Sequence, residues 1–206
     1  MKKTLFFIVF IIVVSNAYSQ KTMGLRVGLN LSRQHTENEV YDLSDMKNKY
    51  GITGNIILKF PMFSFMMFQP ELGYTQKGAR YVGSFYSYST NFEYLELQTN
   101  FIIKSPYHPL YIITGGYASY CLGGSYILNN KPAIEFEISN NNVLFYDAGV
   151  TAGLGLLKDI GKVKSFIEAR YNYGLIDINN KTNSNNTNII NINRGIGVYA
   201  GVLYNI

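Results

Sequence analysis

Residues 24–32 read GLRVGLNLS and alternate strictly between apolar residues and polar residues or glycine. Side chains of a β-strand point alternately to opposite faces, so this stretch is predicted to be a strand with two different faces. Two structures produce that pattern. In a soluble β-protein the apolar face lines a core, and in a membrane barrel it meets lipid while Arg26, Asn30 and the glycines fill the lumen. One strand cannot decide between these structures, so the rest of the chain has to.

The N-terminal residues have the composition of a secretory signal peptide. Two lysines follow the first methionine, an apolar run covers residues 5–14, and the small residues Ala17 and Ser19 precede the expected cleavage site. The apolar run is about half the length of the ~20 residues that a transmembrane helix requires. We therefore expect a signal peptide over 1–19 and an exported domain over 20–206.

Composition narrows the class of the exported domain. A chain of 206 residues is long enough for one domain with a sizeable core. Charged residues make up only 15% of it, whereas tyrosine and glycine are frequent at 18 and 19 residues, a combination that favours a β-barrel. The net charge of +5 includes no basic stripe interleaved with aromatics, so nucleic-acid binding is not expected. Cys121 is the only cysteine, which excludes an internal disulfide and a cysteine metal cluster.

The alternation recurs in eight segments, and no helical periodicity of useful length appears between them. The predicted strands are 22–33, 50–60, 65–80, 92–104, 110–127, 144–158, 163–176 and 194–205. The connections alternate between short segments (61–64, 105–109 and 159–162) and long ones (34–49, 81–91, 128–143 and 177–193). Short turns at one end and long loops at the other are typical of outer-membrane barrels. We predict an all-β fold: an eight-stranded, antiparallel, up-and-down transmembrane β-barrel with both termini in the periplasm.

The two faces of these strands differ in the same way along the chain. One face collects apolar residues, and the other collects charged residues and glycines. Glycine weakens a solvent-facing strand but suits a narrow lumen, and charges buried in a lumen must pair. We therefore expect the apolar face to meet lipid and the opposite face to form a lumen charge network of Arg26, Glu71, Lys77, Glu96, Lys104, Asp147, Glu168 and Arg170.

Four further features lead to narrower expectations. Pro70 lacks a ladder donor, so a bulge or a local ladder break is expected in the third strand. Residues 114–121 (TGGYASYC) show no clean alternation, and the facing of the fifth strand stays open. The Asn-rich segment 179–193 is low in complexity and expected to be mobile. Tyrosines near strand ends are expected to form an interfacial girdle of Tyr50, Tyr74, Tyr94, Tyr111, Tyr173 and Tyr204.

Residues that could carry chemistry are scattered. His35 lies in the first long connection and His108 in a short turn, so the two histidines do not form a metal site. Asp42 and Ser44 share the first long connection with His35, but no spacing marks the three as a triad. We expect neither catalysis nor a bound metal or cofactor.

Five motifs resemble a known family in their order along the chain. They are GLRVGLN (24–30), PELGYTQKG (70–78), YLE (94–96), DAG (147–149) and ARYNYGL (169–175). Together they resemble the PorT-like outer membrane β-barrel proteins of the Bacteroidetes. The resemblance implies a barrel over the whole exported domain and a location in the outer membrane. The member that gives the family its name is tied to protein secretion.

These expectations favour a structural or interaction role for a monomeric barrel embedded in outer-membrane lipid. Its partner would bind the surface loops, or an envelope or secretion complex would bind its periplasmic side. A narrow channel or small-solute porin is the first alternative, although a lumen of eight strands is filled by side chains. An enzyme acting at the outer rim is the second and needs a nucleophile and a base. A soluble lipocalin-like carrier is the third.

Overall fold

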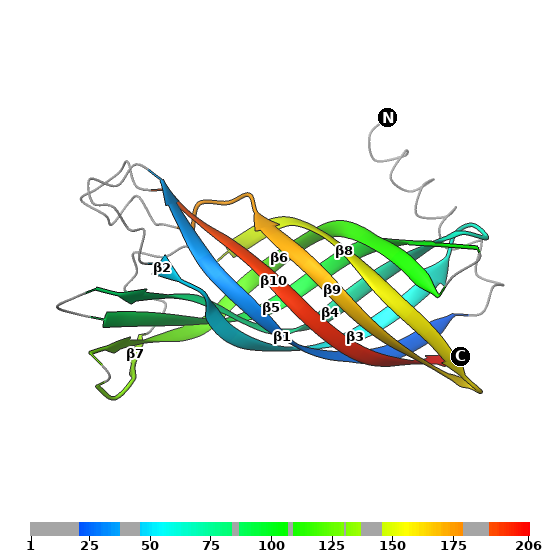
Figure 1. Cartoon of the computed structure of the whole chain (residues 1–206), viewed down its shortest axis with the longest axis horizontal. Helices are drawn as coiled ribbons and strands as arrows, with labels where there is room; N and C mark the ends of the chain where they lie inside the picture. The colour runs from blue at the N-terminus through cyan, green and yellow to red at the C-terminus, as the bar shows by residue number, and fades with distance from the viewer. Residues whose placement is uncertain are drawn as a thin grey trace.

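The computed structural model describes residues 21–37, 46–83, 87–106, 109–129, 131–136, 146–178 and 190–206. Eight long strands form a barrel (Figure 1). They are β1 (Thr22–Glu37), β3 (Lys49–Pro61), β4 (Met66–Val82), β5 (Ser87–Lys104), β6 (Leu110–Leu128), β8 (Tyr146–Ile160), β9 (Val163–Gly174) and β10 (Ile190–Asn205). The short strands β2 (Met46–Lys47) and β7 (Ile134–Phe136) pair with β4 and β6. The expected signal peptide, Asp42, Ser44, His108 and most of the Asn-rich segment lie outside the described residues.

The barrel is closed by its first and last strands. Each long strand pairs antiparallel with the long strands before and after it in the chain, and β1 also pairs with β10 from Thr22↔Asn205 to Glu37↔Ile190. This confirms the predicted eight-stranded, antiparallel, up-and-down barrel. Within the described ranges, no helix has both the length and the apolar character needed to cross a membrane.

Six of the long strands extend beyond their predicted limits at the end that carries the long connections, whereas β8 begins at Tyr146 and β9 ends at Gly174, each two residues short of the prediction. The segment 81–91 is not a long loop: β4 continues to Val82, β5 begins at Ser87, and only residues 83–86 connect them. The rings of Tyr81 and Tyr88 face each other there as a cross-strand pair, with centroids 6.3 Å apart. This part of the hairpin carries no continuous apolar face, so the alternation that identifies the other strands is absent from it.

The apolar face of the strands lies on the outside of the barrel, as the sequence predicts. On β1, Leu25, Val27 and Leu29 are 58–63% exposed, whereas Arg26 and Asn30 on the alternate parity are buried. The same division settles β6, whose facing the sequence left open. Tyr117, Ser119 and Cys121 point inward and are buried, and their neighbours Ala118 and Tyr120 point outward. No clean pattern appears in this stretch of sequence because the inward face of β6 mixes apolar residues such as Tyr117 and Cys121 with the polar Ser119.

Pro70 interrupts one ladder without a bulge. The pairing of β4 with β3 is absent opposite Leu58 and Lys59, and resumes in the same register, with Ile57↔Glu71 on one side and Phe60↔Phe68 on the other. The pairing of β4 with β5 runs through Pro70↔Thr99 without interruption. Of the two expected outcomes, the local ladder break is therefore the correct one. The missing donor removes pairing on one side of the strand only.

Small apolar groups lie inside the barrel toward both ends, among buried polar side chains, and most of the buried charges lie between these groups. Ile57, Phe166 and Leu203 pack together toward the end with the short turns, beside a second group of Ile102, Tyr111 and Ile113. Phe92, Tyr94 and Cys121 pack together toward the other end.

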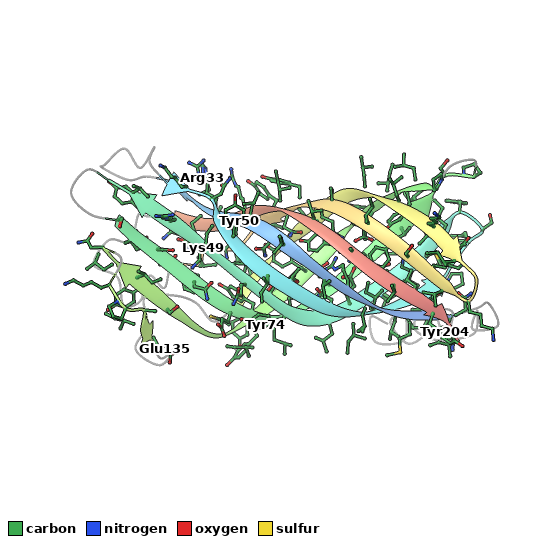
Figure 2. All side chains as sticks on the ribbon, turned by 60° about the horizontal axis from the view of Figure 1, so that its bottom comes forward. Arg33, Lys49, Tyr50, Tyr74, Glu135 and Tyr204 are labelled. Carbon is green, nitrogen blue, oxygen red and sulfur yellow. The ribbon has the colours of Figure 1, made fainter. Side chains whose placement is uncertain are left out.

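The interior packing corrects the expected tyrosine girdle. Tyr94 and Tyr111 are 0% and 2% exposed and lie inside the barrel, because each is two residues from a buried neighbour on the inward face of its strand. Tyr50 and Tyr204 lie on the outer wall at opposite ends of the barrel (Figure 2). Tyr74 and Tyr173 are half-buried.

Candidate functional site

The structure places seven of the eight predicted network residues inside the barrel. All seven are at most 6% exposed, and they come from five strands: Arg26 on β1, Glu71 and Lys77 on β4, Glu96 on β5, Asp147 on β8, and Glu168 and Arg170 on β9. Each lies on the inward parity of its strand, so the pleat alone directs these side chains into the lumen.

Two arginines and two glutamates form the centre of the network, here called the central quartet. Glu71 forms ion pairs with both arginines: its Oε2 lies 2.9 Å from Arg26 Nη2, and its Oε1 lies 2.9 Å from Arg170 Nη2. Glu168 pairs with Arg170 on the same strand and lies 3.8 Å from Arg26. The quartet is neutral, and all four side chains are at 0% exposure. Pairing of this kind offsets the large desolvation cost of burying the four charges.

Neutral side chains add hydrogen bonds to both glutamates of the quartet. Gln69 Nε2 and Asn100 Nδ2 donate to Glu71 at 2.6 and 2.8 Å, and the Tyr111 hydroxyl donates to Glu168 at 2.6 Å. The Tyr199 ring lies 4.3 Å from the Arg26 guanidinium carbon and 5.5 Å from that of Arg170. A ring face in that position stabilises a desolvated cation.

Lys77 is the centre of a second cluster nearer the long connections. Its ammonium pairs with Glu96 at 2.7 Å and with Asp147 at 2.9 Å. Ser119 donates to Glu96 at 2.8 Å, and Asn193 donates to Asp147 at 3.1 Å. This cluster joins four strands: β4, β5, β6 and β8, with β10 added through Asn193.

Gln98 joins the two clusters. Its Nε2 donates to Glu96 at 2.6 Å, and its Oε1 accepts from Arg170 Nη1 at 2.8 Å. The hydrogen-bonded chain therefore runs from Asp147 through Lys77, Glu96 and Gln98 to the central quartet. This hydrogen-bonded chain crosses the lumen, because Glu71 on β4 and Arg170 on β9 come from opposite sides of the barrel.

The structure does not bring Lys104 into this network. Lys104 is the last residue of β5, at the rim of the barrel, where its side chain is half-buried and makes no ion pair with any carboxylate of the described residues. Lys59, which the sequence analysis missed, lies inside instead and is 3% exposed. Its ammonium is 5.2 Å from the centroid of the Phe166 ring and 5.5 Å from that of Tyr111. With Lys59, the described part of the lumen holds four cations and four carboxylates.

One sequence signal could have identified Lys59. It shares the parity of Thr53 and Asn55 on β3, both of which are buried. Ile57 lies between Asn55 and Lys59 on the same parity, so the inward face does not read as uniformly polar. In the structure Ile57 belongs to the apolar group at the short-turn end, so the inward face of β3 changes from polar to apolar along its length.

Glycines on the inward parity make room for the rings that fill the lumen. A methyl group at Gly155 would overlap the ring of Tyr111, and one at Gly197 would overlap that of Tyr199. Gly201 stands in the same relation to Phe166, and Gly149 to Tyr117. Each glycine is a wall neighbour of its ring: Gly155, Gly149 and Gly201 are paired directly with the aromatic residue on the adjacent strand, and Gly197 lies two residues from Tyr199 on β10.

All four interior carboxylates are paired with arginine or lysine. The network is here called the plug, and its ion pairs tie strands on different sides of the barrel together, such as β4 to β9 through Glu71 and Arg170. Among the residues that the structure describes, no group of three or more histidine, cysteine, aspartate or glutamate side chains is placed to hold a metal ion.

A closed eight-stranded barrel with an apolar outer wall and a filled, charged lumen defines the class of small transmembrane β-barrels. Residues 18–180 match the family model described as "Outer membrane protein beta-barrel domain". The chain belongs to this family, and it is an outer-membrane β-barrel protein.

The chain is also similar to solved barrels at low sequence identity. Neisserial surface protein A is 15% identical, with 89% of this chain and 97% of that chain covered and a TM-score of 0.48. Ail, the attachment invasion locus protein of Yersinia pestis, is 12% identical, with 91% and 100% covered and a TM-score of 0.45. The outer membrane protease OmpT from Escherichia coli is 8% identical, with 92% and 98% covered and a TM-score of 0.43. No curated protein sequence matches the chain.

Proposed function

We propose that the protein is a non-conducting, non-enzymatic barrel that holds an interaction surface at the membrane. The observation that carries this proposal is the filled lumen. The central quartet is fully buried, and Gln98 links it to the Lys77 cluster without a gap. A barrel of eight strands has an interior just wide enough for such side chains, so the network leaves a channel no room.

The interaction surface in this proposal is the sheet that projects beyond the barrel at the end with the long connections. It consists of the ends of β4, β5 and β6 together with β7, at the left in Figure 1. Tyr81, Tyr88 and Leu128 lie in one cross-strand row on it, and Tyr126 and Ile134 are 37% and 50% exposed. Tyrosine is enriched at protein interfaces, so this projecting sheet is suited to a protein partner.

The orientation follows from the same proposal. The chain would be exported with a signal peptide over 1–19 and inserted with both ends of the domain in the periplasm. Support comes from the pairing of Thr22 with Asn205, which puts the first and last strands' outer ends together at the short-turn side. The partner would then be a surface ligand or an envelope protein. Membership of the PorT-like group, which the sequence motifs favour, would make it a secretion component.

Two measurements test the proposal. Planar-bilayer recordings of the refolded protein should show no single-channel steps, whereas a variant with Glu71→Ala and Arg170→Ala, which empties the centre of the lumen, should conduct. Steps from the wild-type protein would overturn the plugged barrel. For the interaction surface, a photo-crosslinker at position 88 should capture one defined envelope protein in cells. The same group at Tyr204, on the opposite rim, should not capture it, and equal capture from both positions would contradict the assignment.

A further inference from the structure

Four basic residues lie together on the outer wall at the long-connection end, and are here called the rim cluster. Arg33 on β1 is directly paired with Arg194 on β10, and Lys47 on β2 is directly paired with Arg80 on β4. The two pairs adjoin, because β3 begins at Lys49 opposite Ser32, next to Arg33. Figure 2 shows Arg33 and Lys49 close to Tyr50 at this end of the barrel. The cluster therefore extends over neighbouring strands from β10 to β4.

Like charges placed directly opposite each other destabilise a sheet. Arg33, Lys47 and Arg80 are exposed, and no ion pair joins any of the four to a carboxylate within the part of the chain that the structure describes. Arg194 is held in place by Tyr173, whose hydroxyl accepts its hydrogen bond at 3.1 Å and whose ring centroid is 4.6 Å away. An anion bound from outside the protein would offset the repulsion within the two cationic pairs, Arg33–Arg194 and Lys47–Arg80.

The rim cluster lies at the border of the apolar band on the outer wall, which sets the depth in the membrane at which a bound anion would lie. Two residues before Arg33, the outer wall turns apolar with Leu31↔Ile196 and then Leu29↔Val198, and it remains so to Met23↔Tyr204. Residues 23 to 31 rise about 3.3 Å each, and a tilt of about 40° leaves a band of about 20 Å along the membrane normal. That is close to the apolar band of about 25 Å in such barrels, so Arg33 and Arg194 stand at its border.

A groove beside the cluster adds neutral hydrogen-bonding groups. Arg80 lines this groove of about 420 Å³ together with Asn48, Ser87 and Ser89. Guanidinium groups bind phosphate oxygens through two parallel hydrogen bonds, and hydroxyl and amide groups complete such sites. The groups that line the groove suit a phosphate, and the position of the cluster at the border of the apolar band is the depth at which lipid phosphates lie.

We propose that the rim cluster binds phosphate groups of lipid headgroups in the leaflet at the long-connection end. The lipid would neutralise the opposed cations while its acyl chains lie against the apolar wall below them. The barrel would then select its lipid neighbours by charge on one side of the membrane, in addition to burying its apolar wall.

Native mass spectrometry of the exported domain, refolded in a neutral detergent, tests this proposal with two lipids of equal chain length. Phosphatidylglycerol should stay bound, and phosphatidylcholine should be retained much less. The double variant Arg33→Gln/Arg194→Gln should lose bound phosphatidylglycerol by about tenfold, the factor expected for one lost charge-assisted hydrogen bond. The matched control Lys158→Gln/Lys162→Gln removes two exposed cations at the opposite rim and should retain it. Equal losses in the two double variants would overturn the proposal.

Two further arms distinguish lipid binding from the binding of free phosphate and from a purely structural role of the cluster. Inorganic phosphate at the lipid concentration should leave the bound phosphatidylglycerol in place, and full displacement would mean that the site takes free phosphate rather than lipid. Arg33→Gln alone should not lower the unfolding midpoint in phosphate-free neutral detergent, because it relieves the repulsion from Arg194, but should lower it in bilayers that contain phosphatidylglycerol. An equal drop in both media would show a structural role only and would also overturn the proposal.

Discussion

The carboxylate of Glu71 binds side chains from four strands. Arg26 on β1 and Arg170 on β9 form ion pairs with it. Arg170, Asn100 on β5 and Gln69 on its own strand also donate hydrogen bonds to it. Because the carboxylate is fully buried, the loss of either arginine leaves a buried charge short of a partner. Individual residues of the plug therefore contribute far more to stability than the exposed ion pairs at the barrel ends.

The change Arg170→Met tests this contribution. It removes the partner of Glu71 and Glu168, and we expect a loss of about 3–5 kcal/mol in the free energy of unfolding. Urea unfolding in detergent micelles, followed by the shift in gel mobility of the folded barrel, measures the loss. The matched control is Lys164→Met, whose partly exposed pair with Asp159 spans 3.6 Å and should contribute about 0–1 kcal/mol. Similar losses in both variants would contradict a stabilising plug.

The close approach of Tyr111 to Gly155 gives a second prediction for single residues. Gly155→Ala should cost about 1–3 kcal/mol, because the added methyl overlaps a ring that cannot turn away without breaking its hydroxyl bond to Glu168. Gly54→Ala is the control, since its methyl would meet no atom within 4 Å. The same urea titration compares the two, and a harmless Gly155→Ala would mean that the ring is not fixed.

Within each strand, the pleat divides residues between lipid and lumen. Val27 on β1 and Tyr204 on β10 both point outward and are 63% and 53% exposed, but Val27 lies in the middle of the apolar band, paired with Ala200, and Tyr204 lies at its border. We expect Val27→Arg to cost about 2–4 kcal/mol on refolding into lipid, and Tyr204→Arg about 0–1 kcal/mol. Refolding yields in vesicles over a urea series give both values. Equal costs would mean that the outer wall does not meet a lipid core.

The strands and their facing are predictable from sequence where one face is uniformly apolar. β1, β8, β9 and β10 meet this condition, and their outward residues are those that the alternation identifies. β6 does not meet it, because Tyr111, Ile113 and Tyr117 line its inward face. A small lumen accepts aromatic and aliphatic side chains as readily as charged ones, so the polarity of the residues does not identify the inward face of β6.

The membership of the plug is predictable only in part, for a related reason. Seven of its charged residues follow from parity, since an inward charge must pair. The choice of Lys59 over Lys104 depends on how far along the barrel each lysine sits, and the stagger between strands sets that position. The stagger is fixed by pairings such as Thr22↔Lys59 between β1 and β3, which the parity of one strand cannot reveal.

The molecule as a whole has two different ends, and their sides of the membrane can be tested. The proposed orientation puts residues 131–133, beside β7, outside the cell and the turn at Gly161 and Lys162 in the periplasm. An epitope inserted after Pro132 should bind antibody on intact cells, whereas one inserted after Lys162 should bind only after the outer membrane is opened. The opposite labelling pattern would invert the orientation.

The ion pairs across the lumen also constrain the order in which the barrel assembles. The bond between Arg170 and Glu71 joins residues 99 positions apart, and it can form only after the sheet has rolled up. Until then Glu71 has Arg26 and neutral neighbours from nearby strands, while Arg170 has Glu168 from its own strand. A flat, partly inserted sheet would present these charges to hydrocarbon. The cross-lumen ion pairs therefore couple the burial of these charges to the curling of the sheet and to the pairing of β1 with β10.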